Sequence, residues 1–360
     1  EASFRGQPPI VGTAGDDRLT GTDFPELIAG LAGNDTLTAH GGHDQLEGGD
    51  GDDLLNGAAD SLGIGSGTTT FTGGRGNDTL IGSVFADVYR FDLGDGADTL
   101  IDDSGGSTGG DELRFGAGIS ADSVGFERAN GDLILTLAHS PDRLTLRGWL
   151  TGPSGPNQIE TLRFADGTVW RADEVSERAM RVQGTAGDDV LRGRTDYPDR
   201  LYGLAGNDTL SAAGTGDTLD GGDGDDLLDV GDGYATYMNT YIGGRGNDTL
   251  IGSEYADVYI HRLGDGDDTI VDHADYASSG DDELRFEGIA STDMTAAREG
   301  VDLTLRHANG SDQVTVRNWY ADVYRREQID RIVFADTAWS ADEASFRGQP
   351  PIVGTAGDDR

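Results

Sequence analysis

The clearest pattern along the chain is a nine-residue period of polar and hydrophobic positions. From Gly12 the sequence reads GTAGDDRLT, GTDFPELIA, GLAGNDTLT, AHGGHDQLE and GGDGDDLLN without a gap. Small and polar residues dominate the first six places of each nonamer. An apolar residue holds the eighth place, as Leu19, Ile28, Leu37, Leu46 and Leu55. The glycines indicate a turn, and the single inward apolar residue indicates a short strand with one buried face.

Two such turns and two such strands complete one coil of a flattened right-handed spiral. Residues eighteen apart then stack at about 4.8 Å, the ordinary distance between neighbouring strands. The period resumes after an interruption at 57–72, and it returns from Gly184 with a second interruption at 230–242. We therefore predict an all-β protein with two parallel β-rolls.

The two halves of the chain are diverged copies of one unit. GGRGNDTLIGS occurs at 73–83 and again at 243–253, and DELRF occurs at 111–115 and again at 282–286. The segment EASFRGQPPIVGTAGDDR at 1–18 returns unchanged at 343–360. This repetition predicts neighbouring copies of the same unit in a tandem array. A duplication introduced by cloning is the alternative.

The repeats divide the chain into six segments. We expect the end of a preceding unit at 1–11, a first β-roll at 12–101, a first β cap at 110–180, a second β-roll at 184–271, a second β cap at 281–342 and the start of the next unit at 343–360. The caps are expected because solenoids need atypical terminal pieces.

The sequence of the caps predicts small antiparallel sheets. DLILTLA and RLTLRGW alternate between apolar and polar residues, and NGD and ADGT are typical of hairpin turns. Aromatic residues would fill the small core of each cap: Trp149, Phe164 and Trp170 in the first copy, and Trp319, Phe334 and Trp339 in the second. A separate small β domain on a linker is the alternative.

The charge of the chain adds a requirement for cations. The sequence has 66 acidic and 26 basic residues, which gives a formal net charge of −40. Such a charge repels nucleic acid and anionic lipid, and it opposes compaction unless cations neutralise it. No apolar run approaches the roughly 20 residues that a membrane helix needs, and no cysteine is present for disulfides or thiolate sites. We predict no nucleic-acid partner and no membrane span.

The acids hold a fixed place in the repeat. This disfavours the alternative that the acid excess is only the signature of a halophile or of a GC-rich genome, because such acids would be scattered along the chain. The sixth place carries Asp17, Asp35, Asp44, Asp53, Asp78, Asp87, Asp98, Asp189, Asp208, Asp217, Asp226, Asp248, Asp257 and Asp268. Stacked carboxylates repel unless a hard dication lies between them. Ca²⁺ accepts about six to eight oxygens, whereas Mg²⁺ demands a tighter octahedron. Turn carbonyls would complete the predicted calcium sites, from Gly30, Ala32, Gly48, Asp50, Gly73, Arg75, Gly203, Ala205, Gly221, Asp223, Gly243 and Arg245.

These nonamers resemble the haemolysin-type calcium-binding nonapeptide, GGxGxDxUx, of the repeats-in-toxin (RTX) proteins. GGRGNDTLI and GGDGDDLLN match it at every defined position. The resemblance implies a parallel β-roll with Ca²⁺ in its turns. It also implies export by the type I secretion machinery of a Gram-negative bacterium, with folding outside the cell. The segments at about 110–170 and 281–339 resemble the related segment that often follows such rolls.

Two nonamers depart from the family pattern. GTDFPELIA has Phe24 and Pro25 at its fourth and fifth places, and GRTDYPDRLY is one residue longer than nine. We expect no ion in these turns.

No catalytic motif stands out in the sequence. Neither GxSxG nor HExxH occurs, and His40 and His43 in AHGGHD are replaced by Ala213 and Gly216 in the second copy. The sequence therefore predicts a non-enzymatic, calcium-folded structural module of a large secreted or surface-displayed RTX protein, such as an adhesin or a matrix-like extender. The alternative is the export and folding region of a secreted enzyme or toxin whose catalytic domain lies outside this chain.

Overall fold

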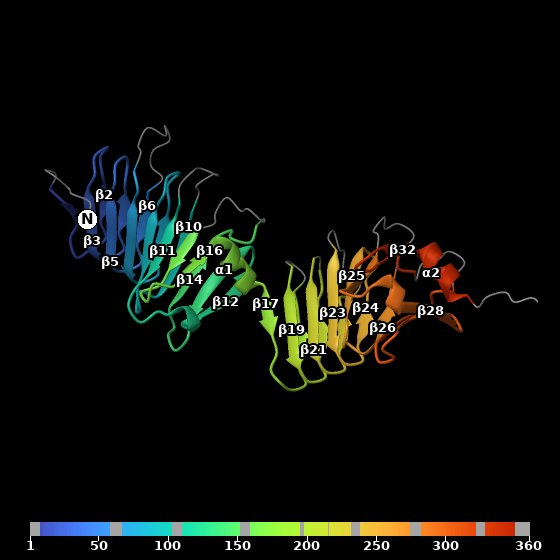
Figure 1. The fold of residues 1–360 in the computed structure, drawn as a ribbon. Helices are drawn as coiled ribbons and strands as arrows, with labels where there is room; N and C mark the ends of the chain where they lie inside the picture. The colour runs from blue at the N-terminus through green and yellow to red at the C-terminus, as the bar shows by residue number, and fades with distance from the viewer. Residues whose placement is uncertain are drawn as a thin grey trace, which may run out of the picture. The chain divides into compact units, whose positions relative to one another are not determined.

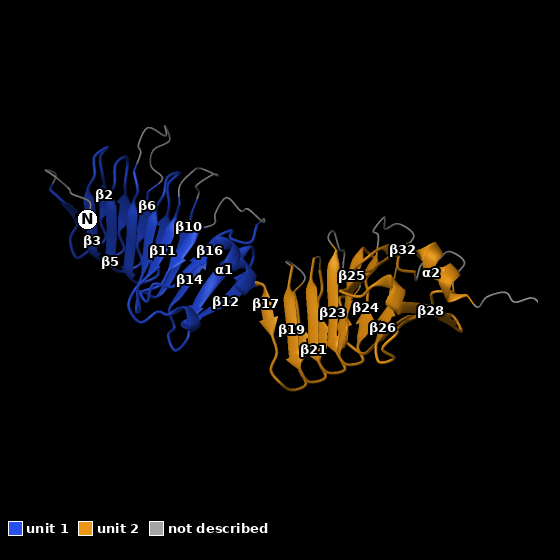
Figure 2. Ribbon diagram, in the orientation of Figure 1, with its two compact units in different colours: residues 1–179 blue, residues 180–360 orange. Residues whose placement is uncertain are grey.

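In the computed structural model the chain forms two compact units, residues 1–179 and 180–360 (Figure 2). The structure describes residues 8–57, 67–102, 110–151, 159–194, 198–214, 216–231, 238–273, 282–321 and 328–349. Within these ranges, no helix has the length and apolar character that crossing a membrane requires.

Unit 1 is built from two sheets of eight strands (Figure 1). The first sheet contains β1 (Ile10–Val11), β3 (Leu27–Ala32), β5 (Gln45–Asp50), β7 (Thr70–Arg75), β9 (Val88–Phe91), β11 (Glu112–Phe115), β15 (Thr161–Arg163) and β16 (Val169–Arg171), in this order across the sheet. The second sheet contains β2 (Arg18–Thr20), β4 (Thr36–Thr38), β6 (Leu54–Asn56), β8 (Thr79–Ile81), β10 (Ala97–Ile101), β14 (Arg143–Leu146), β13 (Asp132–Leu137) and β12 (Val124–Ala129), given from the first coil towards the cap. Up to β11, consecutive strands alternate between the sheets, as the coils of a roll do.

Unit 2 repeats this arrangement. Its first sheet contains β17 (Arg181–Gln183), β19 (Arg200–Ala205), β21 (Thr218–Asp223), β23 (Asn239–Arg245), β25 (Asp257–Arg262), β27 (Glu283–Glu287), β31 (Arg331–Val333) and β32 (Ala338–Ser340). Its second sheet contains β18 (Val190–Arg192), β20 (Thr209–Ser211), β22 (Leu227–Asp229), β24 (Thr249–Ile251), β26 (Asp267–Val271), β30 (Gln313–Val316), β29 (Asp302–His307) and β28 (Met294–Glu299). In the described residues, unit 1 has the 3-10 helix η1 (Ala121–Ser123) and the α-helix α1 (Ala172–Ala179). Unit 2 has the 3-10 helix η2 (Ser291–Asp293) and the α-helix α2 (Ala341–Gly348).

Strand register follows the nine-residue period. β1 pairs in parallel with β3 through Ile10 and Ile28, which are eighteen residues apart. The eighth-place residues point into the roll, and Ile28, Leu37 and Leu46 are fully buried. The predicted parallel rolls with an inward apolar row are therefore confirmed.

Both interruptions of the period are absorbed by a longer coil. β5 pairs with β7 through Gln45 and Thr70, so this coil is seven residues longer than eighteen. β7 and β23 show that the later part of each interruption belongs to the first sheet. Residues 58–66 and 232–237 lie outside the described residues.

Each cap first continues its roll and then closes it. In unit 1, β14 pairs in parallel with β10 and β15 pairs in parallel with β11. The pairs β13 with β14, β12 with β13 and β15 with β16 are antiparallel. Unit 2 repeats the parallel junction through β26 with β30 and β27 with β31. The antiparallel caps are confirmed, and the alternative of a separate β domain is wrong because the cap strands hydrogen-bond to strands of the roll.

A short helix completes each cap. Trp149 is fully buried, and its Nε1 donates to Ser176 Oγ of α1 at 3.0 Å. Trp319 Nε1 donates in the same way to Ser345 Oγ of α2 at 2.8 Å. The boundary predicted between residues 342 and 343 falls inside α2, so residues 343–348 pack with the second cap. Residues 350–360 lie outside the described part of the chain.

Candidate metal centres in the turns

Sixth-place acids form a ladder along one edge of each roll. The backbone N–H of Asp17 donates to Asp35 Oδ1 at 2.7 Å, and the N–H of Asp35 donates to Asp53 Oδ1 at 2.7 Å. The series continues through Asp78 and Asp98. Unit 2 has the equivalent ladder of Asp189, Asp208, Asp226, Asp248 and Asp268. Each Oδ1 atom after the first coil therefore has a backbone partner in the coil before it.

The opposite edge carries a second ladder that the nonamer pattern identifies only in part. Its members are Glu26, Asp44, Thr69, Asp87, Asp111 and Glu160 in unit 1, and Asp199, Asp217, Asn239, Asp257, Asp282 and Asp330 in unit 2. The nine-residue pattern does not identify the acids that lie in the caps or in turns of unusual length. They share one signal, because each stands immediately before a strand of the first sheet.

The second carboxylate oxygen of many ladder acids is buried without a hydrogen-bond partner. In the described residues this holds for Oδ2 of eight sixth-place acids: Asp35, Asp44, Asp53, Asp78, Asp98, Asp208, Asp226 and Asp248. None of these residues is more than 3% exposed. A buried carboxylate oxygen is costly unless a cation or a proton meets it.

First-place glycines leave room beside these oxygens. A β-carbon on Gly30 would overlap Asp35 Oδ2 and would lie 2.6 Å from the carbonyl oxygen of Gly48 in the next coil. The same convergence of an Oδ2 atom and the next carbonyl recurs at Gly48, Gly203 and Gly221. Six of the predicted carbonyl ligands lie next to an Oδ2 atom in this way: those of Gly30, Gly48, Gly73, Gly203, Gly221 and Gly243. All donors are oxygens, so the residues fit a Ca²⁺ ion.

Third-place carbonyls link successive turns. The N–H of Gly33 donates to the carbonyl of Asp50 at 2.9 Å, and the carbonyls of Arg75, Asp223 and Arg245 accept the equivalent bond. Ala32 and Ala205 hold the same place one coil earlier, opposite Asp50 and Asp223. A carbonyl oxygen has two lone pairs, so these bonds leave one for a metal ion.

Turns with Thr or Ser at the second place satisfy their own carboxylate. Asp87 Oδ2 accepts the N–H of Ser83 at 2.6 Å and its hydroxyl at 2.9 Å. Thr13 holds Asp17 in the same way, and the equivalent pairs in unit 2 are Thr185 with Asp189 and Ser253 with Asp257. In four of the predicted ligands Oδ2 therefore already accepts hydrogen bonds: Asp17, Asp87, Asp189 and Asp257.

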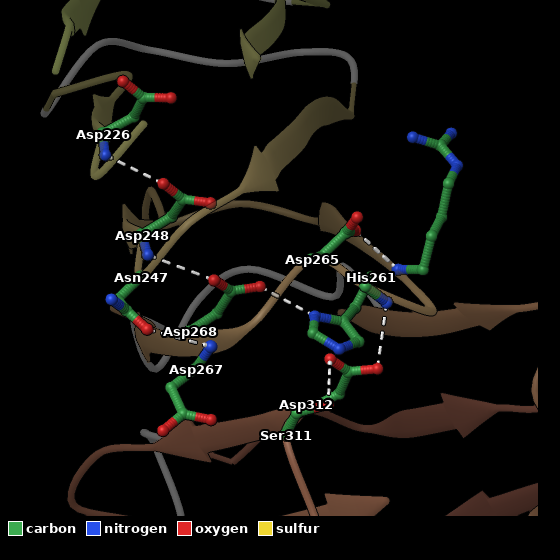
Figure 3. Close-up of polar contacts among 11 residues, drawn as sticks. Asp226, Asn247, Asp248, His261, Asp265, Asp267, Asp268, Ser311 and Asp312 are labelled. Atoms are coloured by element: carbon green, nitrogen blue, oxygen red, sulfur yellow. Dashed lines mark hydrogen bonds and ion pairs between the residues drawn. The ribbon is translucent and has the colours of Figure 1, made fainter. Parts of the chain in front are cut away.

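A histidine meets the last acid of the first ladder in unit 2. His261 Nδ1 lies 2.7 Å from Asp268 Oδ2, and both side chains are 3% exposed (Figure 3). Unit 1 has Phe91 at the equivalent position, and Asp98 Oδ2 is without a hydrogen-bond partner there. The two copies therefore differ in what they offer a cation at this place.

The substitution His261→Phe is expected to add one bound calcium ion per chain. Phenylalanine would leave Asp268 Oδ2 open, as Asp98 Oδ2 is in unit 1. Equilibrium dialysis with elemental analysis at saturating calcium would count the ions. The control His40→Phe changes an exposed turn residue and should leave the count unchanged. An unchanged count in folded His261→Phe would contradict this account of Asp268.

Burial raises the pKa of several ladder carboxyls. Desolvation is the main cause, the backbone N–H donated to each carboxylate opposes it, and neighbouring carboxylates add to it. The pKa reaches about 6 for Asp53, about 7 for Asp44 and Asp78, and about 8 for Asp98 and Asp248. Without metal, the folded ladders therefore hold protons near neutral pH.

Metal-free chain is expected to gain structure as the pH falls from about 8 to about 5. The folded carboxyls have pKa values above the unfolded value of about 3.9, so their stabilisation is fully present below about pH 4 and is lost as the pH rises through 6 to 8. Calcium displaces these protons, so the apparent affinity of the chain for calcium should increase as the pH rises from about 6 to about 8. Circular dichroism in EDTA, and calcium titrations at several pH values, would test both trends. Equal β content at pH 5 and pH 8 in EDTA would contradict the first trend, and an apparent calcium affinity that does not change with pH would contradict the second.

Family models match both kinds of segment. The RTX calcium-binding nonapeptide repeat matches residues 10–23, 20–55, 64–88, 181–196, 194–228, 202–237 and 234–258. The haemolysin-type calcium binding protein related domain matches residues 132–174 and 302–343. RTX nonapeptide repeats bind Ca²⁺ at multiple sites, which agrees with the oxygen-lined turns described above.

Similar proteins are found among solved structures. No curated protein matches the sequence. Among solved structures, the crystal structure of extracellular lipase LipA from Serratia marcescens is similar at 18% sequence identity, with a TM-score of 0.28. The match covers 94% of this chain and 40% of the length of the lipase chain.

Proposed function

Because the chain is an RTX repeat protein, with a haemolysin-type calcium binding protein related domain after each roll, we propose that it is a calcium-folded structural module of a large secreted or surface-displayed protein. The observation that carries this proposal is the set of buried Oδ2 atoms that have no hydrogen-bond partner, on eight of the ladder acids. In this account calcium is a structural component, because the ladders are electrostatically unfavourable without it.

We assign the calcium ions first to the turns in which an open Oδ2 atom meets a first-place carbonyl of the next coil. Asp35 with Gly48, and Asp53 with Gly73, are examples in unit 1. Turns closed by Thr or Ser are assigned no ion of this kind, because the Oδ2 atom of their carboxylate is already hydrogen-bonded. The contrast makes the second residue of each nonamer a determinant of which turns bind an ion between an open Oδ2 atom and a first-place carbonyl.

The proposed role in the larger protein is that of an extender such as those in adhesins or matrix-like proteins. Support comes from the duplicated unit and from the recurrence of residues 1–18 at 343–360. Only Met180 lies between the end of helix α1 and the start of β17, the first strand of the next roll. Residues 349–360, after α2, repeat the sequence of residues 7–18, which supports a further unit in the array.

The proposed route to the outside is type I secretion from a Gram-negative bacterium. A cytosol poor in free calcium keeps the chain unfolded and competent for export, and calcium outside the cell folds it. Deleting the type I transporter of the source bacterium should retain the protein inside the cell. Unchanged appearance of the protein in the medium or on the surface would contradict this route.

The reading frame around these residues tests the extender role separately. Several near-identical units of this period are expected in the same open reading frame. A single catalytic domain before these residues, with no further copies of the unit, would replace the extender role with that of an export and folding region.

A further inference from the structure

A compact group of three acids lies where each roll meets its cap. Asp87, Asp102 and Asp111 each offer a carboxylate oxygen, and these oxygens lie within 4.8 Å of one another. Unit 2 has the same arrangement of Asp257, Asp272 and Asp282. None of the six residues is more than 3% exposed. Only Asp87 and Asp257 hold the sixth place of a nonamer, and the other four lie outside the segments that either family model matches.

Asp102 stands where the two preceding coils have Gly57 and Gly82. Ile101 pairs with Ile81, and the N–H of Gly82 donates to the carbonyl of Ile101 at 2.8 Å. Asp102 is the next residue, so its side chain enters the space that first-place glycine leaves open in earlier coils. A β-carbon on Gly82 would lie 2.8 Å from Asp102 Oδ1 and 3.3 Å from Asp87 Oδ2.

The equivalent space in unit 2 has the same lining. A β-carbon on Gly252 would lie 2.7 Å from Asp272 Oδ1 and 3.0 Å from Asp257 Oδ2. The hydroxyl of Tyr259 also reaches this point and donates to Asp272 Oδ1 at 2.7 Å. Two diverged copies of the unit have therefore kept one set of oxygen donors around one glycine.

Hydrogen bonds orient these acids and leave one oxygen open in each group. Asp111 Oδ1 accepts the N–H of Asp87 at 2.7 Å, whereas Asp111 Oδ2 is buried without a hydrogen-bond partner. In unit 2 it is Asp272 Oδ2 that is buried without a partner. Both residues are completely buried. A buried open oxygen beside two further carboxylates requires a cation or a proton.

We propose that each three-acid group binds one calcium ion, at a site distinct from the two-carboxylate sites of the turns. The inference rests on the proposed calcium-dependent folding. The donors are all oxygens, and the charge of three carboxylates suits a divalent cation that accepts many oxygen ligands. The N–H and hydroxyl of Ser83 hold Asp87 in place, as outer-shell partners of a metal ligand do.

The position of this site gives the ion a particular structural role. Asp87 lies just before β9, Asp102 just after β10 and Asp111 just before β11. An ion shared by these three residues joins both sheets at the last coil of the roll, where the cap begins. It therefore fixes the junction between the roll and the cap.

The test is the number of calcium ions bound by the full chain carrying Asp102→Asn and Asp272→Asn. Native mass spectrometry at saturating calcium should show two fewer ions per chain than wild type. The matched control, Asp122→Asn with Asp293→Asn, removes the same charge from one exposed residue of η1 and one of η2 and should lose none. An unchanged count in the folded double variant would overturn the proposal, because the groups would then hold only protons.

A second measurement covers a variant that fails to fold in calcium. Crystals of the wild-type chain soaked in terbium should show an anomalous peak among Asp87, Asp102 and Asp111, and another in unit 2. Peaks in the turns without peaks at the three-acid groups would overturn this proposal and leave calcium-dependent folding intact. If EDTA leaves the circular dichroism unchanged, the proposed function fails instead.

Discussion

Removal of calcium by excess EDTA at neutral pH is expected to unfold both rolls and to abolish most of the β-sheet signal in far-UV circular dichroism. When free calcium is about ten times the dissociation constant, each site contributes roughly 1.4 kcal/mol to the folded state. The eight sixth-place acids with an open Oδ2 atom would then supply roughly 11 kcal/mol in total if each marks one site. This is comparable to the whole net stability of an ordinary domain, about 5 to 15 kcal/mol.

Restoring calcium should restore the signal, and an equal concentration of magnesium should not. Magnesium demands a tighter octahedral shell and releases its water reluctantly, so it fits the turns less well. The same β content in EDTA as in calcium would contradict calcium-dependent folding. Full recovery with magnesium alone would contradict the assignment of the sites to calcium.

The substitution Gly48→Ala is expected to cause the second large effect. Its β-carbon would overlap Asp53 Oδ2 and would lie 2.5 Å from the carbonyl oxygen of Gly73, in the space assigned to an ion. Loss of one site and the steric overlap together should lower the free energy of unfolding by about 2 to 4 kcal/mol. A calcium titration followed by thermal unfolding should show weaker apparent affinity and a Tm lower by roughly 5 to 15 °C.

Gly15→Ala is the matched control for this experiment. Gly15 is also a turn glycine of unit 1, and a β-carbon there would meet no atom within 4 Å. Neither glycine has a positive φ, so the two substitutions differ in what the methyl group meets and not in backbone strain. Equal effects of the two substitutions would contradict the assignment of the space beside Gly48 to an ion.

The sequence predicted the rolls because their period is short and physically simple. One apolar residue in nine, such as Leu46, can be buried in every coil only if coils of eighteen residues stack in parallel. The same arithmetic placed Asp35 and Asp53 in one ladder. These features depend only on the spacing of residues along the chain, which can be read directly from the amino-acid sequence.

Other features of the sites depend on contacts that spacing does not encode. Asp111 belongs to the second ladder because Glu112 pairs with Val88, although the chain between them departs from the nine-residue period. His261 takes up Asp268 Oδ2 because strands β25 and β26 lie on opposite walls of one coil. Ser83 closes its turn through its hydroxyl and N–H, which the consensus pattern of the repeat does not distinguish from an ion-binding turn.

A crystal structure of the chain grown in calcium would show directly whether ions lie between the carboxylates of successive turns. An ion is expected at about 2.3 to 2.6 Å from both Asp53 Oδ2 and the carbonyl oxygen of Gly73, with equivalent ions beside the other open Oδ2 atoms. Electron density for water alone at these positions, in saturating calcium, would contradict this expectation.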